Sequence, residues 1–220
     1  MKKSKGFFAL TILLLIGFIV FTFMIMKNDV QAIGPLDSKV GFATINKKMA
    51  DMFGLNMFWY KLSKYLGYLA LLIGGMFGLL GLAELIKRKS LFKVDYYILL
   101  MGLLFVIVMV YYVFFNKVAF NYRPVILDEA EGLEPSYPSS HTMLAVTIFG
   151  SAMIACSRIF KRNRQYRTIA YIAFSFLMVL MVVARMLSGV HWFTDIIGGI
   201  IVSTGLIMLY YSAVLYVEGK

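Results

Sequence analysis

Three short blocks of the sequence combine residue types that suit phosphate chemistry. The blocks are Arg123-Pro124, Pro138-Ser139-Ser140-His141 and Arg185-x5-His191-x3-Asp195. Guanidinium groups bind phosphate oxygens in a bidentate fork, and an imidazole can act as nucleophile or proton carrier. Each block lies at the end of a strongly apolar segment, where ionisable side chains are costly and usually functional. The pattern indicates a phosphate-binding and phosphoryl-transfer site in a membrane protein.

The third block predicts an oriented nucleophile. The step Ser188-Gly189 is expected to end one apolar segment, so that the chain turns and presents His191 at the start of the next. His191 and Asp195 are four residues apart and would share one face of a helix. The carboxylate of Asp195 can then take the Nδ1 proton of His191, which leaves Nε2 free to attack.

The second block predicts an anion site at a helix end. Ser139, Ser140 and His141 follow Pro138 and open an apolar segment, so backbone N–H groups and a positive helix end would face an anion there. His141 is positioned to donate a proton to a leaving oxygen. Arg123 and Arg185 suit the neutralisation of charge on a transferring phosphoryl group.

The composition predicts an all-α, polytopic membrane protein. Of the 220 residues, 61% are hydrophobic and only 15% are charged, whereas about a quarter are charged in soluble domains. The run from Phe7 to Met26 exceeds a signal-peptide core of about 7–15 residues, and we interpret it as a retained helix. A single membrane-embedded domain, 1–220, is expected. Its six predicted spans are 7–26, 65–86, 95–115, 140–158, 168–187 and 193–216.

The charge distribution predicts the orientation in the cell membrane. Thirteen of the 22 basic residues, Lys220 included, and three of the 11 acidic ones fall on the side of the two termini, which carries +10 of the net +11. By the positive-inside rule both termini are cytoplasmic and the three blocks face outside. No basic patch remains that requires nucleic acid as a partner.

The segment between the first two spans has a different character. From Leu36 to Tyr60, apolar residues recur at helical spacing among lysines and aspartates, which predicts an amphipathic helix on the outer membrane surface. Trp59 and Tyr60 then resemble an interfacial anchor. The alternative is an ordinary outer loop that packs on the bundle.

The three blocks together resemble the type-2 phosphatidic acid phosphatase superfamily of integral membrane lipid phosphatases, whose pattern is K-x6-R-P, P-S-G-H and S-R-x5-H-x3-D. The order of the blocks, the spacing of the third block and the six spans agree over essentially the whole chain. The resemblance implies that His191 forms a phosphohistidine, Asp195 orients it and His141 protonates the leaving group. Arg123, Arg185, Ser139 and Ser140 would hold the phosphate, without metal or cofactor.

The sequence departs from this pattern at three positions. Ser140 replaces the glycine before the histidine, and Ala184 replaces the serine before Arg185. Lys117 lies six residues before Arg123, whereas the pattern places the lysine at Asn116. We assign Lys117 to phosphate binding, the alternative being a lysine that reaches toward water at the interface.

The substrate expected from the resemblance is a lipid phosphate in the bilayer. The outward site favours undecaprenyl diphosphate, with phosphatidylglycerophosphate and phosphatidic acid as alternatives. A non-catalytic lipid-phosphate binder or transporter would need broken helices in related halves, and Gly74-Gly75 and Gly198-Gly199 are candidates for such breaks. Haem ligation by the two histidines would leave the arginines without a role. The acidic run Asp128, Glu129, Glu131 and Glu134 is interpreted as a solvated loop over the site, or as a lid. The oligomeric state has no signal in the sequence.

Overall fold

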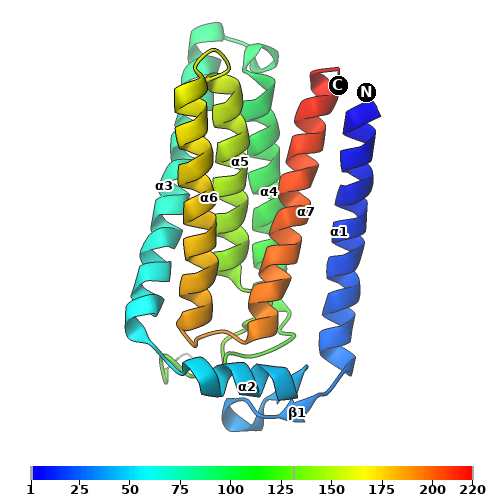
Figure 1. Cartoon of the computed structure of the whole chain (residues 1–220), viewed down its shortest axis with the longest axis vertical. Helices are drawn as coiled ribbons and strands as arrows, with labels where there is room; N and C mark the ends of the chain where they lie inside the picture. The colour runs from blue at the N-terminus through cyan, green and yellow to red at the C-terminus, as the bar shows by residue number, and fades with distance from the viewer. Residues whose placement is uncertain (1, 131, 220) are drawn as a thin grey trace.

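The computed structural model describes residues 2–130 and 132–219, so Glu131 of the acidic run and Lys220 lie outside the described residues. Within that part of the chain, six helices are long and apolar enough to cross a membrane, as predicted. They form an upright bundle, and a shorter helix crosses one end of it (Figure 1). The helices are α1 (Lys2–Lys27), α2 (Ala43–Phe53), α3 (Met57–Arg88), α4 (Tyr96–Lys117), α5 (Ser140–Ile159), α6 (Arg164–Leu187) and α7 (Phe193–Val217).

The second predicted span begins too late in the sequence. α3 starts at Met57, well before residue 65, because Asn56 caps it. The Asn56 side-chain oxygen accepts the backbone N–H groups of Phe58 and Trp59 at 3.1 and 3.3 Å. These are donors that a helix start otherwise leaves unpaired. The other predicted spans match their helices to within a few residues.

The amphipathic helix predicted over Leu36–Tyr60 is shorter than expected. Within that range only α2 is a complete α-helix, and Met57–Tyr60 already belong to α3. α2 is preceded by a small hairpin of β1 (Gln31–Ala32) and β2 (Lys39–Val40), with the 3-10 turn η1 (Pro35–Asp37) between the strands. The chain leaves the hairpin at Gly41, where a Cβ atom would lie 1.7 Å from the carbonyl oxygen of Ile25. This close approach holds the hairpin against the end of α1.

α2 packs on the end of the bundle. Its buried residues are Ala43 and Asn46, while Met52 on another face is exposed. The Asn46 amide donates to the Thr194 hydroxyl at 2.8 Å and accepts the Thr194 backbone N–H at 3.1 Å. These contacts tie α2 to the first turn of α7. The segment therefore packs on the bundle, as the alternative interpretation expected, but it does so as a helix and not as a loop.

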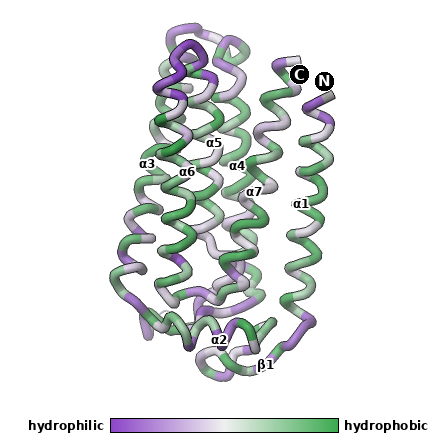
Figure 2. Tube along the Cα trace, viewed as in Figure 1, coloured by the Kyte–Doolittle hydropathy of each residue, from purple (hydrophilic) through white to green (hydrophobic). Residues whose placement is uncertain are grey.

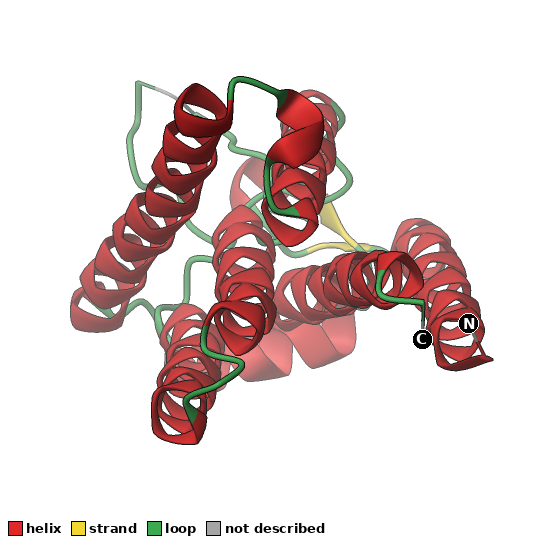
Figure 3. Ribbon diagram, turned by 90° about the horizontal axis from the view of Figure 1, so that it is seen from above, coloured by secondary structure: helices red, strands yellow, loops and turns green. Residues whose placement is uncertain are grey.

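The centre of the bundle is formed by α5 and α7, which are the most buried of the six long helices described. Close contact between them requires a glycine: a Cβ atom at Gly150 would lie 2.4 Å from the Ile207 side chain. α1 stands at the edge beside α7, and seen from above the other helices surround α5 (Figures 1 and 3). The green, hydrophobic residues dominate the length of the bundle, and polar residues gather at its two ends (Figure 2). This is the distribution that a bilayer requires.

The three sequence blocks come together at one end. The amino ends of α5 and α7 and the carboxyl ends of α4 and α6 all lie near α2, while both chain termini lie at the opposite end (Figure 1). α3 continues without a break through Gly74-Gly75, and α7 does so through Gly198-Gly199. The broken helices expected of a transporter are therefore not found at these glycines.

Candidate active site

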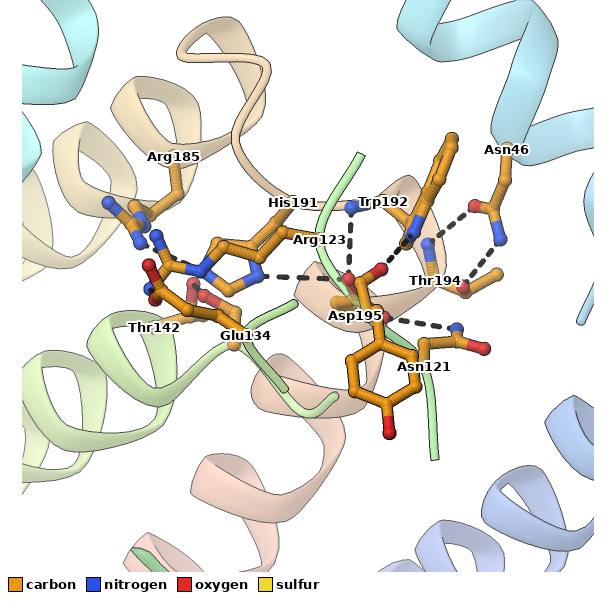
Figure 4. A network of polar contacts seen from close by, with 12 residues as sticks. Asn46, Asn121, Arg123, Glu134, Thr142, Arg185, His191, Trp192, Thr194 and Asp195 are labelled. Carbon is orange, nitrogen blue, oxygen red and sulfur yellow. Dashed lines mark hydrogen bonds and ion pairs between the residues drawn. The ribbon is translucent and has the colours of Figure 1, made fainter. Parts of the chain in front are cut away.

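Arg185 is fully buried in the last turn of α6 and is held from two sides. Its Nη1 donates to the Ser63 hydroxyl at 3.0 Å, and its guanidinium carbon lies 5.9 Å from the centre of the Tyr60 ring. Its Nη2 lies 2.8 Å from Nε2 of His191 (Figure 4). Because a guanidinium can only donate, Nε2 is the acceptor, and the proton of the neutral ring is on Nδ1. This is the tautomer that a nucleophilic Nε2 requires.

The turn that presents His191 is confirmed where the sequence predicts it. α6 ends at Leu187, and Gly189 has a φ of +68°, a conformation that glycine adopts without steric cost. A Cβ atom at Gly189 would also lie 1.9 Å from the carbonyl oxygen of Gly54. The loop before α3 therefore packs directly on this turn, and its Asn56 N–H donates to the Ser188 carbonyl at 3.1 Å.

The predicted relation between His191 and Asp195 is partly wrong. The two residues do not share a helix face, because α7 starts at Phe193 and His191 precedes it. Asp195 is fully buried, and its Oδ2 accepts the backbone N–H of Trp192 at 2.9 Å. The same oxygen lies 3.7 Å from His191 Nδ1, so the carboxylate faces the ring beyond hydrogen-bond distance. Asn121 donates to the other oxygen, Oδ1, at 3.3 Å.

His191 is held in its neutral form. Its pKa lies well below the usual 6.5, first because the ring is buried, and then because Arg185, Arg123 and His141 place positive charge near it. A buried neutral imidazole has an unprotonated nitrogen that can act as a nucleophile, and the guanidinium groups beside it can bind an anion.

His141 lies in the first turn of α5 and packs against α3. A Cβ atom at Gly67 would lie 3.1 Å from Cδ2 of the His141 ring, so the missing side chain at Gly67 leaves room for the imidazole. The charges of Arg185, Arg123 and Lys64 all act on His141. The predicted acid thus belongs to the same positively charged cluster as His191.

α3 therefore contributes a wall of the site that the sequence interpretation missed. Tyr60, Ser63, Lys64 and Gly67 are spaced i, i+3, i+4 and i+7, which at about 100° per residue keeps them within one face of the helix. Tyr60 and Ser63 contact Arg185, and Gly67 contacts His141. The sequence interpretation missed this wall because Tyr60, Ser63 and Lys64 precede the span predicted at 65–86, although their helical spacing with Gly67 was readable.

Ser139 joins the second block to the third. Its N–H donates to the Asp195 backbone carbonyl at 2.9 Å, and its hydroxyl accepts from Thr142 at 3.0 Å. The N–H of Ser139 is thus used within the protein, contrary to the expectation that it is free for an anion. Ser140 is half-buried and is the first residue of α5. The amino end of this helix therefore lies next to His141.

Arg123 is paired with an acidic residue. Its Nη2 lies 2.9 Å from Oε2 of Glu134, and its backbone N–H donates to the Glu134 carbonyl at 3.0 Å (Figure 4). The side chain of Arg123 is 15% exposed. The end of the acidic loop therefore lies over the site and supplies a carboxylate to the arginine predicted to bind phosphate.

Among the residues that the structure describes, Lys117 forms no hydrogen bond or ion pair with this cluster. It is exposed in the last turn of α4. Asn116, the position that the family pattern assigns to lysine, instead lines a small pocket together with Ser136, Pro138 and Ser140. The one-residue offset of Lys117 from the family position thus means that its side chain leaves α4 in a different direction from that of Asn116.

The fold and the site together define a class of protein, an integral membrane phosphatase with a buried histidine and arginine centre. Residues 96–218, more than half of the chain and all three blocks, match the PAP2 superfamily. The chain belongs to the PAP2 superfamily and is a multi-pass membrane lipid phosphatase.

The fold is similar to that of a solved member of the same superfamily. A crystal structure of a transmembrane PAP2-type phosphatidylglycerolphosphate phosphatase from Bacillus subtilis covers 96% of this chain and 97% of its own, with a TM-score of 0.66. The sequences are only 16% identical, so this likeness concerns the fold. Among the curated proteins compared, none matches the chain.

Proposed function

We propose that this lipid phosphatase removes the terminal phosphate of undecaprenyl diphosphate at the outer face of the membrane, through a phosphohistidine at His191. The observation that carries the proposal is the 2.8 Å contact between Arg185 and Nε2 of His191. It combines an unprotonated nucleophile with a buried phosphate-binding group. A phosphoryl group that enters between them would meet Nε2 on one side and the guanidinium on its oxygens.

The reaction then has two steps with complementary proton transfers. Nε2 of His191 attacks the terminal phosphorus, the bond from phosphorus to the bridging oxygen breaks, and His141 protonates the departing lipid phosphate. Water next attacks the phosphohistidine, His141 takes its proton, and inorganic phosphate leaves. Asp195 stabilises the positive charge that develops on the His191 ring during attack.

Substrate phosphate would replace two protein contacts. It takes the place of Nε2 on Arg185, and it competes with Glu134 for Arg123. Ser140 and the start of α5 add the positive end of a helix, and Ser139 holds that end against α7. Lys117 stays a predicted phosphate ligand. Its side chain would reach the phosphate only by turning from the exposed face of α4 toward Arg123.

A diphosphate is favoured over a monoester by Lys64. Lys64 lies on the same face of α3 as Gly67, which contacts His141, the residue beside the leaving group. Lys64 is exposed, without a hydrogen bond or ion pair among the described residues. The leaving group of a diphosphate carries negative charge that such a cation stabilises, whereas a monoester releases a neutral alcohol. Lys64→Met should therefore lower kcat/KM for the diphosphate by about 5-fold more than for phosphatidic acid, the effect of roughly 1 kcal/mol.

Lys48→Met is the matched control, because Lys48 is an exposed lysine at the same end of the bundle and lies about 200° around α2 from the bundle-facing Asn46. An equal loss on both substrates in Lys64→Met, or an equal loss in Lys48→Met, would exclude the diphosphate argument.

The direct experiment is phosphate release by the purified enzyme from undecaprenyl diphosphate, phosphatidylglycerophosphate and phosphatidic acid, beside His191→Ala. We expect the highest kcat/KM for the diphosphate, retention of activity in chelator, and loss of activity in the variant. Equal release by wild type and variant would refute the mechanism, and preference for a monoester would refute the substrate.

The outward orientation is tested separately. In a Cys156→Ser background, a cysteine at Glu129 in the acidic loop should react with a membrane-impermeant reagent in intact cells. Labelling only after permeabilisation would mean that the site faces the cytoplasm.

A further inference from the structure

A second charged cavity lies at the opposite end of the bundle from the catalytic cluster. Its volume is about 840 Å³, and it opens where the ends of α1, α4, α5, α6 and α7 meet. Four basic side chains and one acidic side chain line it: Lys3, Arg158, Lys161, Arg167 and Glu218. The remaining lining is largely aromatic, with Tyr96, Tyr97, Tyr171, Tyr211 and Phe7.

The inner wall of this cavity is organised by hydrogen bonds. Arg158 pairs with Glu218, Nε to Oε1 at 3.1 Å, and it donates to the Ser157 hydroxyl at 2.6 Å. The Tyr96 hydroxyl donates to the same Glu218 oxygen at 2.8 Å. The Arg158 guanidinium also lies over the Tyr211 ring, 5.5 Å from its centre. One cation and the one carboxylate are thus fixed against each other.

The other cations at the cavity keep their charge available. Among the described residues, Lys3, Lys161 and Arg167 form no ion pair, although all three line the same space. Together with the Arg158–Glu218 pair they leave the cavity strongly positive. Phe7, which is half-buried on α1, supplies apolar surface at this cavity, and Leu215 on α7 is buried behind it. The cavity therefore combines positive charge at a membrane boundary with an apolar wall along the lipid.

The positive-inside rule accounts for basic residues at this end, but it requires only that they lie near the ends of the spans. Lys87 and Lys89, at the end of α3, satisfy it as exposed residues that do not line the cavity. At the cavity, by contrast, cations from α1, the end of α5 and α6 converge on one tyrosine-rich space. The positive-inside rule does not require this convergence. Basic pockets between membrane helices bind the headgroups of anionic lipids.

We propose that this cavity binds the phosphate-bearing headgroup of an anionic phospholipid of the adjacent leaflet, at a site distinct from the catalytic one. The headgroup phosphate lies among Lys3, Lys161 and Arg167, tyrosine hydroxyls offer further hydrogen bonds, and the acyl chains leave past Phe7. A lipid held there links the edge helix α1 to α6 across the end of α7. The bound form is thereby stabilised against unfolding by mass action.

The test is a thermal-unfolding titration of the detergent-purified protein with short-chain phosphatidylglycerol, phosphatidylcholine and inorganic phosphate. We expect phosphatidylglycerol to raise Tm in a saturable way, and the other two to have little effect at the same concentrations. The double variant K161Q/R167Q should raise the apparent Kd for phosphatidylglycerol by about 25-fold, the effect of two charges. The single variant K161Q should change it in the same direction by about 5-fold, the effect of one charge.

The matched control is K87Q/K89Q, which removes the same charge from the same end of the bundle outside the cavity. It should change the apparent Kd by less than about 2-fold, because exposed charges at a distance are screened by salt. Both double variants should keep wild-type phosphate release, since none of these residues contacts the catalytic cluster. An equal loss of affinity in the control would overturn the proposal. So would stabilisation by inorganic phosphate that K161Q/R167Q weakens, because phosphate bound at the catalytic site would not respond to that variant. The absence of any phosphatidylglycerol effect on the wild type would also overturn it.

Discussion

Gly67→Ala isolates the part that α3 plays in placing His141. The new Cβ atom would lie 3.1 Å from Cδ2 and 3.7 Å from Nε2 of the ring. Carbon atoms in contact lie about 3.5 Å apart or more, so the ring must move by about 0.4 Å. The imidazole is the end of a side chain, so it yields more readily than the backbone of α3. The substitution therefore acts on the proposed acid without removing any catalytic group.

The expected loss of activity follows from this displacement. A misplacement of about 1 Å costs on the order of 100-fold in rate, so one of about 0.4 Å costs roughly 6-fold in kcat. Stability should not fall in parallel, because alanine is favoured over glycine within a helix by about 0.5–1 kcal/mol. A variant that is slower but no less stable separates an effect on the site from general damage.

Gly75→Ala is the matched control, because it lies in the same helix and its Cβ atom would meet nothing within 4 Å. It should have the same benefit to the helix and wild-type kcat. The assay is steady-state phosphate release with both variants, beside thermal unfolding in detergent. If Gly67→Ala and Gly75→Ala had equal kcat, the placement of His141 by α3 would be refuted.

Four further predictions concern three other groups of the site. The pKa of His191 lies well below 6.5, so the acid limb of kcat/KM should also lie well below 6.5, and a limb near 7 would contradict the buried neutral ring. Thermal stability should fall as the pH drops below about 6.5, because the unfolded chain then binds a proton that the native ring does not. Ser63→Ala leaves the buried guanidinium of Arg185 without one acceptor. The variant should lower kcat/KM about 10-fold or more, which corresponds to roughly 1.5 kcal/mol or more. Unchanged kinetics would exclude a role for this bond. Glu134→Gln removes the charged partner of Arg123 while its backbone carbonyl remains, so inhibition by inorganic phosphate should tighten by up to about 5-fold, and weaker inhibition would show that the carboxylate supports binding.

The sequence by itself determined the six-span architecture of the bundle and brought the three blocks to one end of it. Six apolar runs predict six spans, because inside a bilayer a helix is the simplest structure that pairs all backbone N–H and C=O groups in hydrogen bonds. The three blocks placed His141, Arg185, His191 and Arg123 at one end, since the number of spans between them decides on which side each lies. The turn at Gly189 was also readable, because its positive φ is a local property of glycine.

Only the tertiary structure decided how those groups meet. Asp195 was expected to bond His191 along a helix, but α7 begins two residues after the histidine, and the carboxylate is directed to the Trp192 N–H. Glu134 pairs with Arg123 across a loop whose course no periodicity predicts. The α3 wall of Tyr60, Ser63 and Gly67 is more than 70 residues from the histidines it serves. Local rules follow from neighbours in the chain, whereas these contacts depend on which helix faces pack together, and that is settled by the fit of the whole bundle.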